Sequence, residues 1–178
     1  MIDIRFIAAA GLAALALAGC GAADVGVDGG APRVVAATDL EAGRYLVKVA
    51  GCNDCHTPGY IQSGGITPEA DWLKGNNHGF MGPWGTTYPH NLRLTTAALT
   101  EDAWVEMLNT RKTRPIMPWP SVAAMADADK RAIYRYIRSL PGDPGQPAPV
   151  ALPPGQVPTA TSYEDLNIRM PAAASPPR

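Results

Sequence analysis

The stretch Cys52-Asn53-Asp54-Cys55-His56 decides how the rest of this chain is organised. It reads Cys-x-x-Cys-His, which is the attachment signature of a c-type haem. Two thiols three residues apart lie on one side of a helical turn, so both can reach the vinyl groups of one porphyrin and close thioether bonds. The imidazole of His56 follows directly and comes under the ring as the proximal iron ligand. The sequence therefore predicts one covalent haem c, attached at Cys52 and Cys55, with its iron on His56.

Two other kinds of site use paired cysteines, and both fit this chain less well. A thioredoxin-like redox pair needs a βαβ setting, which the sequence around Cys52 lacks. A zinc site needs a second pair of ligands at matching spacing, and the only other cysteine, Cys20, has a different explanation. The haem interpretation is therefore the one on which the remaining predictions depend.

The N-terminus is typical of an export signal. The apolar run at residues 6–18 is too short to span a bilayer but suits a signal peptide. It leads into Leu-Ala-Gly-Cys ending at Cys20, which resembles the bacterial lipoprotein box, and ordinary cleavage nearby is the alternative. We predict a signal peptide at 1–19, lipidation of Cys20 and a flexible tether at 20–37. The same resemblance implies that Gly21 would favour the outer membrane if the host is Gram-negative. Covalent haem attachment occurs outside the bacterial cytoplasm, so the predicted location is the periplasm.

The first predicted helix begins with a capping box, in which Thr38 is the N-cap and Glu41 follows three residues later. Gly43 lies inside this helix, where it costs about 1 kcal/mol relative to Ala. We therefore expect Gly43 to allow close packing against another helix, one near the end of the domain. The predicted apolar face consists of Leu40, Gly43, Val47 and Ala50.

Two further helices are predicted, and the connections between them are rich in Gly, Pro and Asn with few strand signals. One starts at Thr100 and has acidic residues in its first turn. The other covers residues 127–140 and stops at a Pro-Gly pair. The predicted fold class is all-α, with one domain at 38–140 whose long loops surround the cofactor. The predicted apolar faces are Trp104 and Leu108 in the first of these helices, and Ile133, Tyr136, Ile137 and Leu140 in the second.

The capped helix, the haem motif, a Met-Pro-Trp loop at 117–119 and the final helix together resemble a class I cytochrome c. The segment 82–92 is similar to bacterial periplasmic cytochromes, including the cytochrome domains attached to alcohol and aldehyde dehydrogenases. The resemblance covers about residues 38–140 and implies the class I fold, with helices around one haem. It also implies that Trp84 and Asn91 line the haem edge and donate hydrogen bonds to a propionate. A Gly-rich turn with an ordinarily packed Trp is the alternative.

The second axial ligand decides the chemistry, because iron held by His and Met carries electrons whereas an open position binds gases or substrates. Met117 is the predicted ligand. Pro118 disfavours the α region at Met117 and holds it extended, so this loop can aim a thioether at the iron. The basic residues before it, Arg111, Lys112 and Arg114, could pair with propionates, face an acidic partner or form a solvated surface. The other candidate ligands are Met81, Met107, Met125, Met170, His78 and His90, of which Met107 is expected in the core and the two histidines in loops or on the surface.

The C-terminal tail, residues 141–178, is rich in proline and has almost no apolar period. We predict that it is extended, without a core of its own and loosely attached. The residues that could pin it to the domain or to a partner are Tyr163, Leu166, Ile168 and Met170. The chain has 15 basic and 16 acidic side chains, so its charge does not suggest nucleic acid as a partner.

These features predict an electron carrier rather than an enzyme: a lipid-anchored periplasmic monohaem cytochrome c with His/Met-ligated iron. Its partners would be redox proteins, either a dehydrogenase as donor or an oxidase or cytochrome as acceptor. One alternative is a haem enzyme or gas sensor with an open sixth site, although the Met-Pro-Trp loop has no good distal acid or base near it. Another is a cytochrome subunit fixed within a dehydrogenase complex, with the proline-rich tail as its docking segment.

Overall fold

The computed structural model describes residues 32–166, and its first helix, α1, spans Asp39–Val49. The predicted capping box is confirmed, because the Thr38 hydroxyl accepts a hydrogen bond from the Glu41 N–H and the Glu41 carboxylate accepts one from the Thr38 N–H. The predicted apolar face is wrong at its two ends, where Leu40 is 46 % exposed and Ala50 is also exposed. The buried face instead consists of Ala42, Gly43, Leu46 and Val47.

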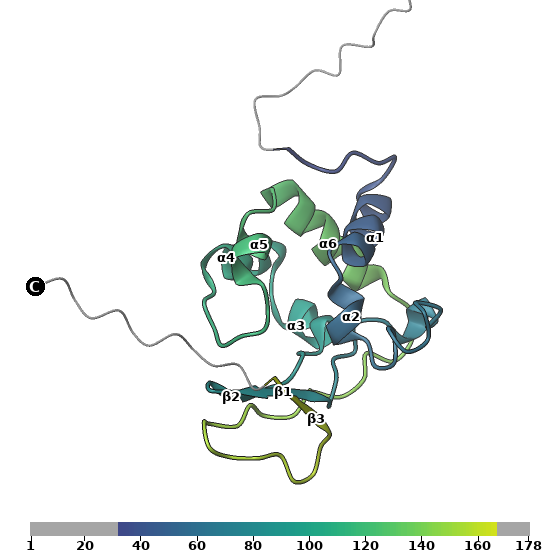
Figure 1. The fold of residues 1–178 in the computed structure, drawn as a ribbon. Helices are drawn as coiled ribbons and strands as arrows, with labels where there is room; N and C mark the ends of the chain where they lie inside the picture. The colour runs from purple at the N-terminus through teal and green to yellow at the C-terminus, as the bar shows by residue number, and fades with distance from the viewer. Residues whose placement is uncertain (1–31, 167–178) are drawn as a thin grey trace, which may run out of the picture. The chain divides into compact units, whose positions relative to one another are not determined.

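The closest helix packing joins α1 to α6, which spans Asp127–Ser139 (Figure 1). A Cβ atom added at Gly43 would lie 2.1 Å from the Ala132 carbonyl oxygen and 2.7 Å from the Tyr136 Cβ. The expectation that Gly43 serves close packing against the last helix is therefore confirmed. The predicted apolar face of α6 is also confirmed, since Ile133, Tyr136 and Ile137 are buried.

Helix α4 spans Glu101–Thr110 and lies against α6. The Thr100 side chain caps it by accepting a hydrogen bond from the Ala103 N–H, and Trp104 and Leu108 are buried as predicted. The Trp104 indole N–H donates to the Lys130 carbonyl oxygen at 3.0 Å. Tryptophan and tyrosine therefore supply the aromatic part of the core.

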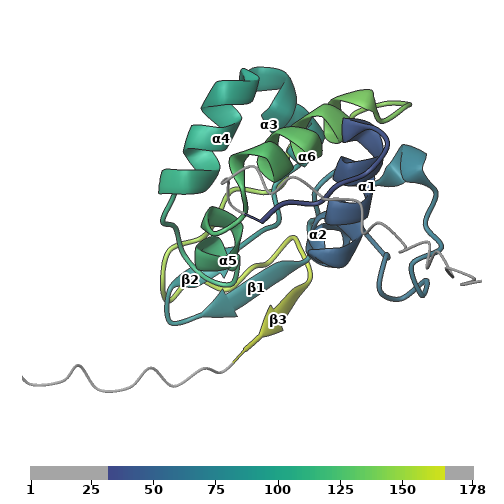
Figure 2. The same cartoon turned by 90° about the horizontal axis from the view of Figure 1, so that it is seen from above.

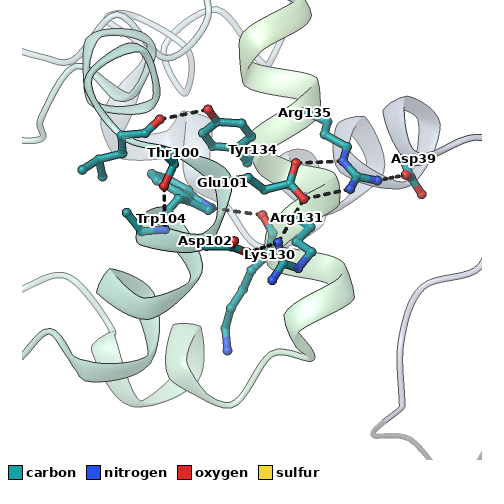
Figure 3. Close-up of polar contacts among 11 residues, drawn as sticks. Asp39, Thr100, Glu101, Asp102, Trp104, Lys130, Arg131, Tyr134 and Arg135 are labelled. Carbon is teal, nitrogen blue, oxygen red and sulfur yellow. Dashed lines mark hydrogen bonds and ion pairs between the residues drawn. The ribbon is translucent and has the colours of Figure 1, made fainter.

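Ion pairs reinforce the junction of α1, α4 and α6 (Figure 3). Glu101 of α4 accepts two hydrogen bonds from Arg135 of α6, at 2.8 and 2.9 Å, and one from Arg131 at 3.1 Å. Arg135 also pairs with Asp39 in the first turn of α1, and Arg131 pairs with Asp102 at 2.6 Å. Three helices far apart in the sequence are thus tied at one place.

Short helices and a small sheet complete the described chain. The sheet has the strand order β2-β1-β3, with β1 antiparallel to β2 and parallel to β3, and the all-α prediction did not include it. No described helix, within residues 32–166, is long and apolar enough to cross a membrane. The remaining elements are α2 (Cys52–His56), η1 (Glu69–Asp71), β1 (Gly79–Gly82), β2 (Gly85–Thr87), α3 (Leu92–Ala98), α5 (Trp119–Ala123) and β3 (Tyr163–Asp165).

The described part of the tail, residues 141–166, is extended but not loosely attached. Its strand β3 pairs with β1, and Leu152 exchanges two backbone hydrogen bonds with Thr86, at 2.9 and 3.0 Å. In Figure 1 this yellow segment runs beneath the sheet. The prediction of loose attachment failed because these contacts use backbone groups of the tail, which leave no apolar pattern in its sequence.

Some predictions lie outside the described residues. These are the signal peptide at 1–19, Cys20 and most of the tether at 20–37, and Ile168 and Met170 of the tail. Within the part of the tether that is described, the Val34 N–H donates to the Asp129 carboxylate at 2.9 Å. The tether is therefore bound to α6 at that residue.

Candidate haem-binding site

The haem motif forms the short helix α2, which lies beside α1 (Figure 2). Gly51 precedes it with a φ of 67°, in the left-handed region that glycine adopts at low cost. Cys52 and Cys55 are one turn apart on this helix, both are partly exposed, and neither forms a disulfide. The helical placement of the two thiols that the sequence predicted is therefore present.

His56 is held by a main-chain oxygen. Its Nδ1 atom lies 2.7 Å from the His90 carbonyl oxygen, and its side chain is buried. A carbonyl only accepts hydrogen bonds, so Nδ1 carries the proton and Nε2 carries the lone pair. Burial lowers the pKa of His56, which favours this neutral form. The geometry thus prepares Nε2 as a metal ligand, with its ring orientation fixed by the second nitrogen.

The pKa values of the two thiols are shifted in the opposite direction to those of a reactive redox pair. Burial raises the pKa of Cys52 to about 11. Burial, followed by the neighbouring Asp54 carboxylate, raises the pKa of Cys55. Reactive cysteine pairs have lowered pKa values that stabilise the thiolate. Neither thiol is stabilised in that way here, which weighs against the thioredoxin-like alternative.

A buried network of hydrogen bonds holds α2 against the chain segment at Leu73 and Gly75. The Thr57 hydroxyl donates to the Asn53 side-chain oxygen at 2.7 Å and accepts from the Leu73 N–H at 2.8 Å. The His56 carbonyl accepts from the Gly75 N–H at 2.9 Å. The sequence interpretation assigned no role to Asn53 and Thr57, because single polar residues beside the motif carry no pattern of their own.

The Met117 loop, residues 111–118, connects α4 to α5. The Thr87 hydroxyl donates to the Pro115 carbonyl at 2.9 Å, and Arg114 donates to the Leu152 carbonyl at 2.7 Å. Met117 itself is partly buried and comes two residues before the first turn of α5. In both views α5 lies on the side of α4 whereas α2 lies on the side of α1 (Figures 1 and 2). His56 is thus the last residue of the helix beside α1, whereas Met117 lies in the loop that leads into α5.

One short segment, 85–91, contacts both predicted ligand regions. It supplies the His90 carbonyl to His56 and the Thr87 hydroxyl to the Met117 loop. Thr87 and His90 are three residues apart, and three residues of extended chain cover at most about 11 Å, so the two contacts start from points no further apart than that. No local sequence pattern indicates this connection, since both contacts use a backbone carbonyl oxygen, that of His90 in one and that of Pro115 in the other.

Most other candidate ligands have contacts of their own. Met107 and Met125 pack against the core, and an Arg111 guanidinium nitrogen lies 3.3 Å from the Met107 sulfur. The His78 Nδ1 atom and the Ser162 hydroxyl oxygen are hydrogen-bonded at 2.9 Å, and the His90 side chain is exposed. Met81 lies in β1, and Met170 lies outside the described residues.

Asn91 and Trp84 differ in what they offer a propionate. The Asn91 amide donates to the Pro144 and Gln146 carbonyls at 2.8 and 3.1 Å, so both of its hydrogens bind the tail. Its oxygen caps α3 by accepting from the Leu94 N–H. Asn91 therefore holds the tail and caps α3, and its hydrogen bond to a propionate stays a prediction.

Trp84 retains a donor. Its indole Nε1 is buried and has no hydrogen-bond partner among the described residues, as is also true of Thr86 Oγ1 and Asn53 Nδ2. A buried unpaired donor costs about 1–3 kcal/mol, and a haem carries two carboxylates that can accept from it. The residues present thus fit a haem, with Trp84 as a donor and His56 Nε2 as an iron ligand.

Of the basic residues before Met117, Arg111 stacks over the Trp119 ring at 5.6 Å, and Arg114 binds the tail. Although the His90 residue is exposed, desolvation of part of its ring, followed by the Arg111 charge, lowers its pKa.

Comparisons with protein-family models, characterised proteins and solved structures found no match. The interpretation of the site therefore depends on the residues of the chain itself.

Proposed function

We propose that this chain is a class I monohaem cytochrome c that transfers single electrons. The observation that carries the proposal is the hydrogen bond from His56 Nδ1 to the His90 carbonyl, within a helical Cys-x-x-Cys-His motif. Because this bond holds Nδ1, the lone pair on Nε2 of His56 points away from the His90 carbonyl and is available to a metal. Burial of the ring excludes water and protons that would compete for that lone pair.

Each residue has a separate task in this proposal. Cys52 and Cys55 form the two thioether bonds, and His56 supplies the proximal nitrogen. Met117 would supply a second iron ligand, and the Trp84 indole would donate to a propionate. The haem iron, when bound, supplies reversible one-electron oxidation and reduction. A carrier with both axial positions filled needs no substrate pocket. Its partners would be redox proteins, a dehydrogenase as donor and an oxidase or cytochrome as acceptor.

Retention of haem after denaturation tests the attachment. Protein made together with a haem-maturation system should keep its pigment through denaturation and organic extraction. Cys52→Ala combined with Cys55→Ala should lose it, and Glu106→Ala, at an exposed residue of α4, is a control outside the motif. If the pigment of the wild-type protein extracts freely, the chain is not a c-type cytochrome.

The role of Met117 separates the carrier from an enzyme or sensor. A neutral thioether favours Fe(II), so Met/His ligation raises the reduction potential. The oxidised protein should show the weak near-infrared band of sulfur-to-iron charge transfer. Met117→Ala should remove the band, lower the potential and admit carbon monoxide, whereas Met107→Leu should preserve it. A wild-type protein without the band that binds carbon monoxide readily would favour the enzyme or sensor.

We also propose that Cys20 carries lipid and holds the domain at the periplasmic side of a membrane. The lipoprotein-like sequence that ends at Cys20 supports this. Labelled fatty acid should appear on the wild-type chain and be absent from Cys20→Ala. Absence of label from the wild-type chain in a lipidating host would refute the anchor.

A further inference from the structure

One oxygen atom of the tail joins two parts of the candidate site. The Leu152 carbonyl accepts a hydrogen bond from the Thr86 N–H at 3.0 Å and another from the Arg114 guanidinium at 2.7 Å. The Leu152 N–H donates back to the Thr86 carbonyl at 2.9 Å. Thr86 belongs to β2 and Arg114 to the Met117 loop, so Leu152 links the strand and the loop.

The hairpin is built to admit the tail at this point. Gly85 has a φ of 96°, and a Cβ atom there would lie 2.1 Å from the Leu152 carbonyl oxygen. Any other residue at this position would both strain the backbone and displace the tail. The approach of Leu152 therefore depends on a glycine in β2 and is not a loose surface contact.

Further contacts fix the tail on both sides of Leu152. Before it, the Pro144 and Gln146 carbonyls accept from Asn91. After it, the Thr161 hydroxyl is bonded to the Tyr88 hydroxyl at 2.7 Å, and the Ser162 carbonyl accepts from the Gly79 N–H at 2.9 Å. The tail thus holds the segment 85–91, which in turn contacts both His56 and the Met117 loop.

We propose that Leu152 is a positioning residue, whose carbonyl holds the Met117 loop against β2 and so sets how firmly Met117 is presented to the iron. This rests on the proposed function, because it assigns Met117 to a haem. Loss of the contact should free the loop while leaving the attachment at Cys52 and Cys55 intact. The tail would then control the reactivity of the iron without touching the covalent bonds.

Two variants break the contact from opposite sides. Arg114→Gln removes the guanidinium from the loop. Truncation after Gln146 removes Leu152 together with Thr161, Ser162 and β3, while it keeps the tail carbonyls that bind Asn91 and Arg93. Arg114→Gln is therefore the variant that isolates the contact with Leu152. Arg138→Gln, at an exposed cation of α6, is the control for charge and leaves the tryptic site at Arg111 unchanged. Truncation after Leu166 is the control for chain length, since it removes only residues outside the described structure.

The first measurement does not need haem. Tryptic cleavage after Arg111 reports local opening of the loop. Loss of an ordinary hydrogen bond raises the population of an open state by roughly tenfold, so both variants should be cleaved about ten times faster than their controls. Arg114→Lys, which keeps a cationic donor, should recover most of the protection.

The second measurement uses the haem-loaded protein. Arg114→Gln and the truncation after Gln146 should retain covalent haem, lose part of the sulfur-to-iron band and bind carbon monoxide faster than the controls. A purely structural role would lower the melting temperature but leave the band unchanged at low temperature, and that result would overturn the proposal.

Equal cleavage rates in Arg114→Gln and Arg138→Gln would also overturn it, because Arg114→Gln is a substitution at an exposed residue. If the wild-type chain holds no covalent haem, the proposed function fails by itself. The cleavage rates then still decide whether Leu152 holds the loop.

Discussion

Gly43 is the residue on which the contact between α1 and α6 depends. Its missing side chain lets the Ala132 carbonyl and the Tyr136 side chain lie directly against the α1 backbone. Two opposing effects act at this position. Alanine favours the helix by about 1 kcal/mol, whereas a Cβ atom would overlap with a backbone oxygen that cannot rotate away.

We expect Gly43→Ala to destabilise the protein by about 2 kcal/mol, because overpacking costs about 1–3 kcal/mol and an overlap with backbone lies at the upper end. Denaturant unfolding followed by circular dichroism measures the change. Tyr45→Ala, at a 55 % exposed side chain of the same helix, should change the unfolding free energy by less than about 0.5 kcal/mol. A gain in stability for Gly43→Ala would mean that the two helices are not in this close contact.

Predictions for single residues succeeded where a local signal existed. Thr38 and Glu41 have the spacing of a capping box, and Gly43 is conspicuous inside a helical pattern. The structural role of Asn91 was not predicted, because its amide donates to the carbonyls of Pro144 and Gln146, more than fifty residues later. No local sequence pattern near Asn91 indicates these hydrogen-bond partners.

At the scale of elements, Lys130 joins α4, α5 and α6. It is 1 % exposed, and its ammonium group donates to the Ala123 carbonyl at 3.0 Å and to the Asn109 side-chain oxygen. It also pairs with Asp127 at 3.3 Å. Since Ala123 is the last residue of α5, the ammonium group fixes the end of the short helix that follows the Met117 loop.

Lys130→Met should therefore destabilise the protein by about 1–3 kcal/mol, since the methionine fills the volume but leaves the acceptors unpaired. The measurement is again the free energy of unfolding. Lys48→Met, at an exposed lysine of α1, should change it by less than about 0.5 kcal/mol. Equal effects of the two substitutions would show that the contacts of Lys130 add nothing to stability.

Helices and strands differed in how far they could be predicted. Threonine caps directly precede α1 and α4, and α1, α4 and α6 all carry helical periodicity in their own residues. The strands β1 and β2 are short and glycine-containing, and β3 pairs with a strand more than eighty residues earlier. Their alignment depends on partners distant in sequence, which local patterns do not encode.

At the scale of the whole molecule, the ion pairs around Glu101 couple stability to pH. The hydrogen bonds from Arg135, and then those from Arg131, lower the pKa of Glu101 below its ordinary value of 4.5. A carboxylate with a lowered pKa in the folded state stabilises that state at neutral pH. This contribution is lost as the pH falls below about 4.5 and through the pKa of the folded protein.

The unfolding free energy should therefore fall between pH 5 and pH 3, and Glu101→Gln should flatten that fall. Because such pairs lie near the surface, we expect the difference to be about 1 kcal/mol. Glu106→Gln, at an exposed carboxylate of the same helix, serves as control. A pH dependence that Glu101→Gln leaves unchanged would exclude Glu101 as its source.

The helical placement of the predicted attachment residues could be predicted from the sequence, whereas the contacts that support them could not. The spacing of Cys52, Cys55 and His56 is a complete local signature. The supports are the His90 carbonyl, the buried Asn53 and Thr57 pair, and the tail at Leu152, each of which reaches the site through the fold.

The anchor of His56 has a consequence for experiments that scan the gene one codon at a time. The anchoring oxygen belongs to the peptide group of residue 90, so every amino acid placed there still provides it. An alanine scan would report a tolerant position and overlook the contact. Deleting or inserting one residue between Thr87 and His90 would move that carbonyl out of register with His56. Such length variants would therefore reveal the contact.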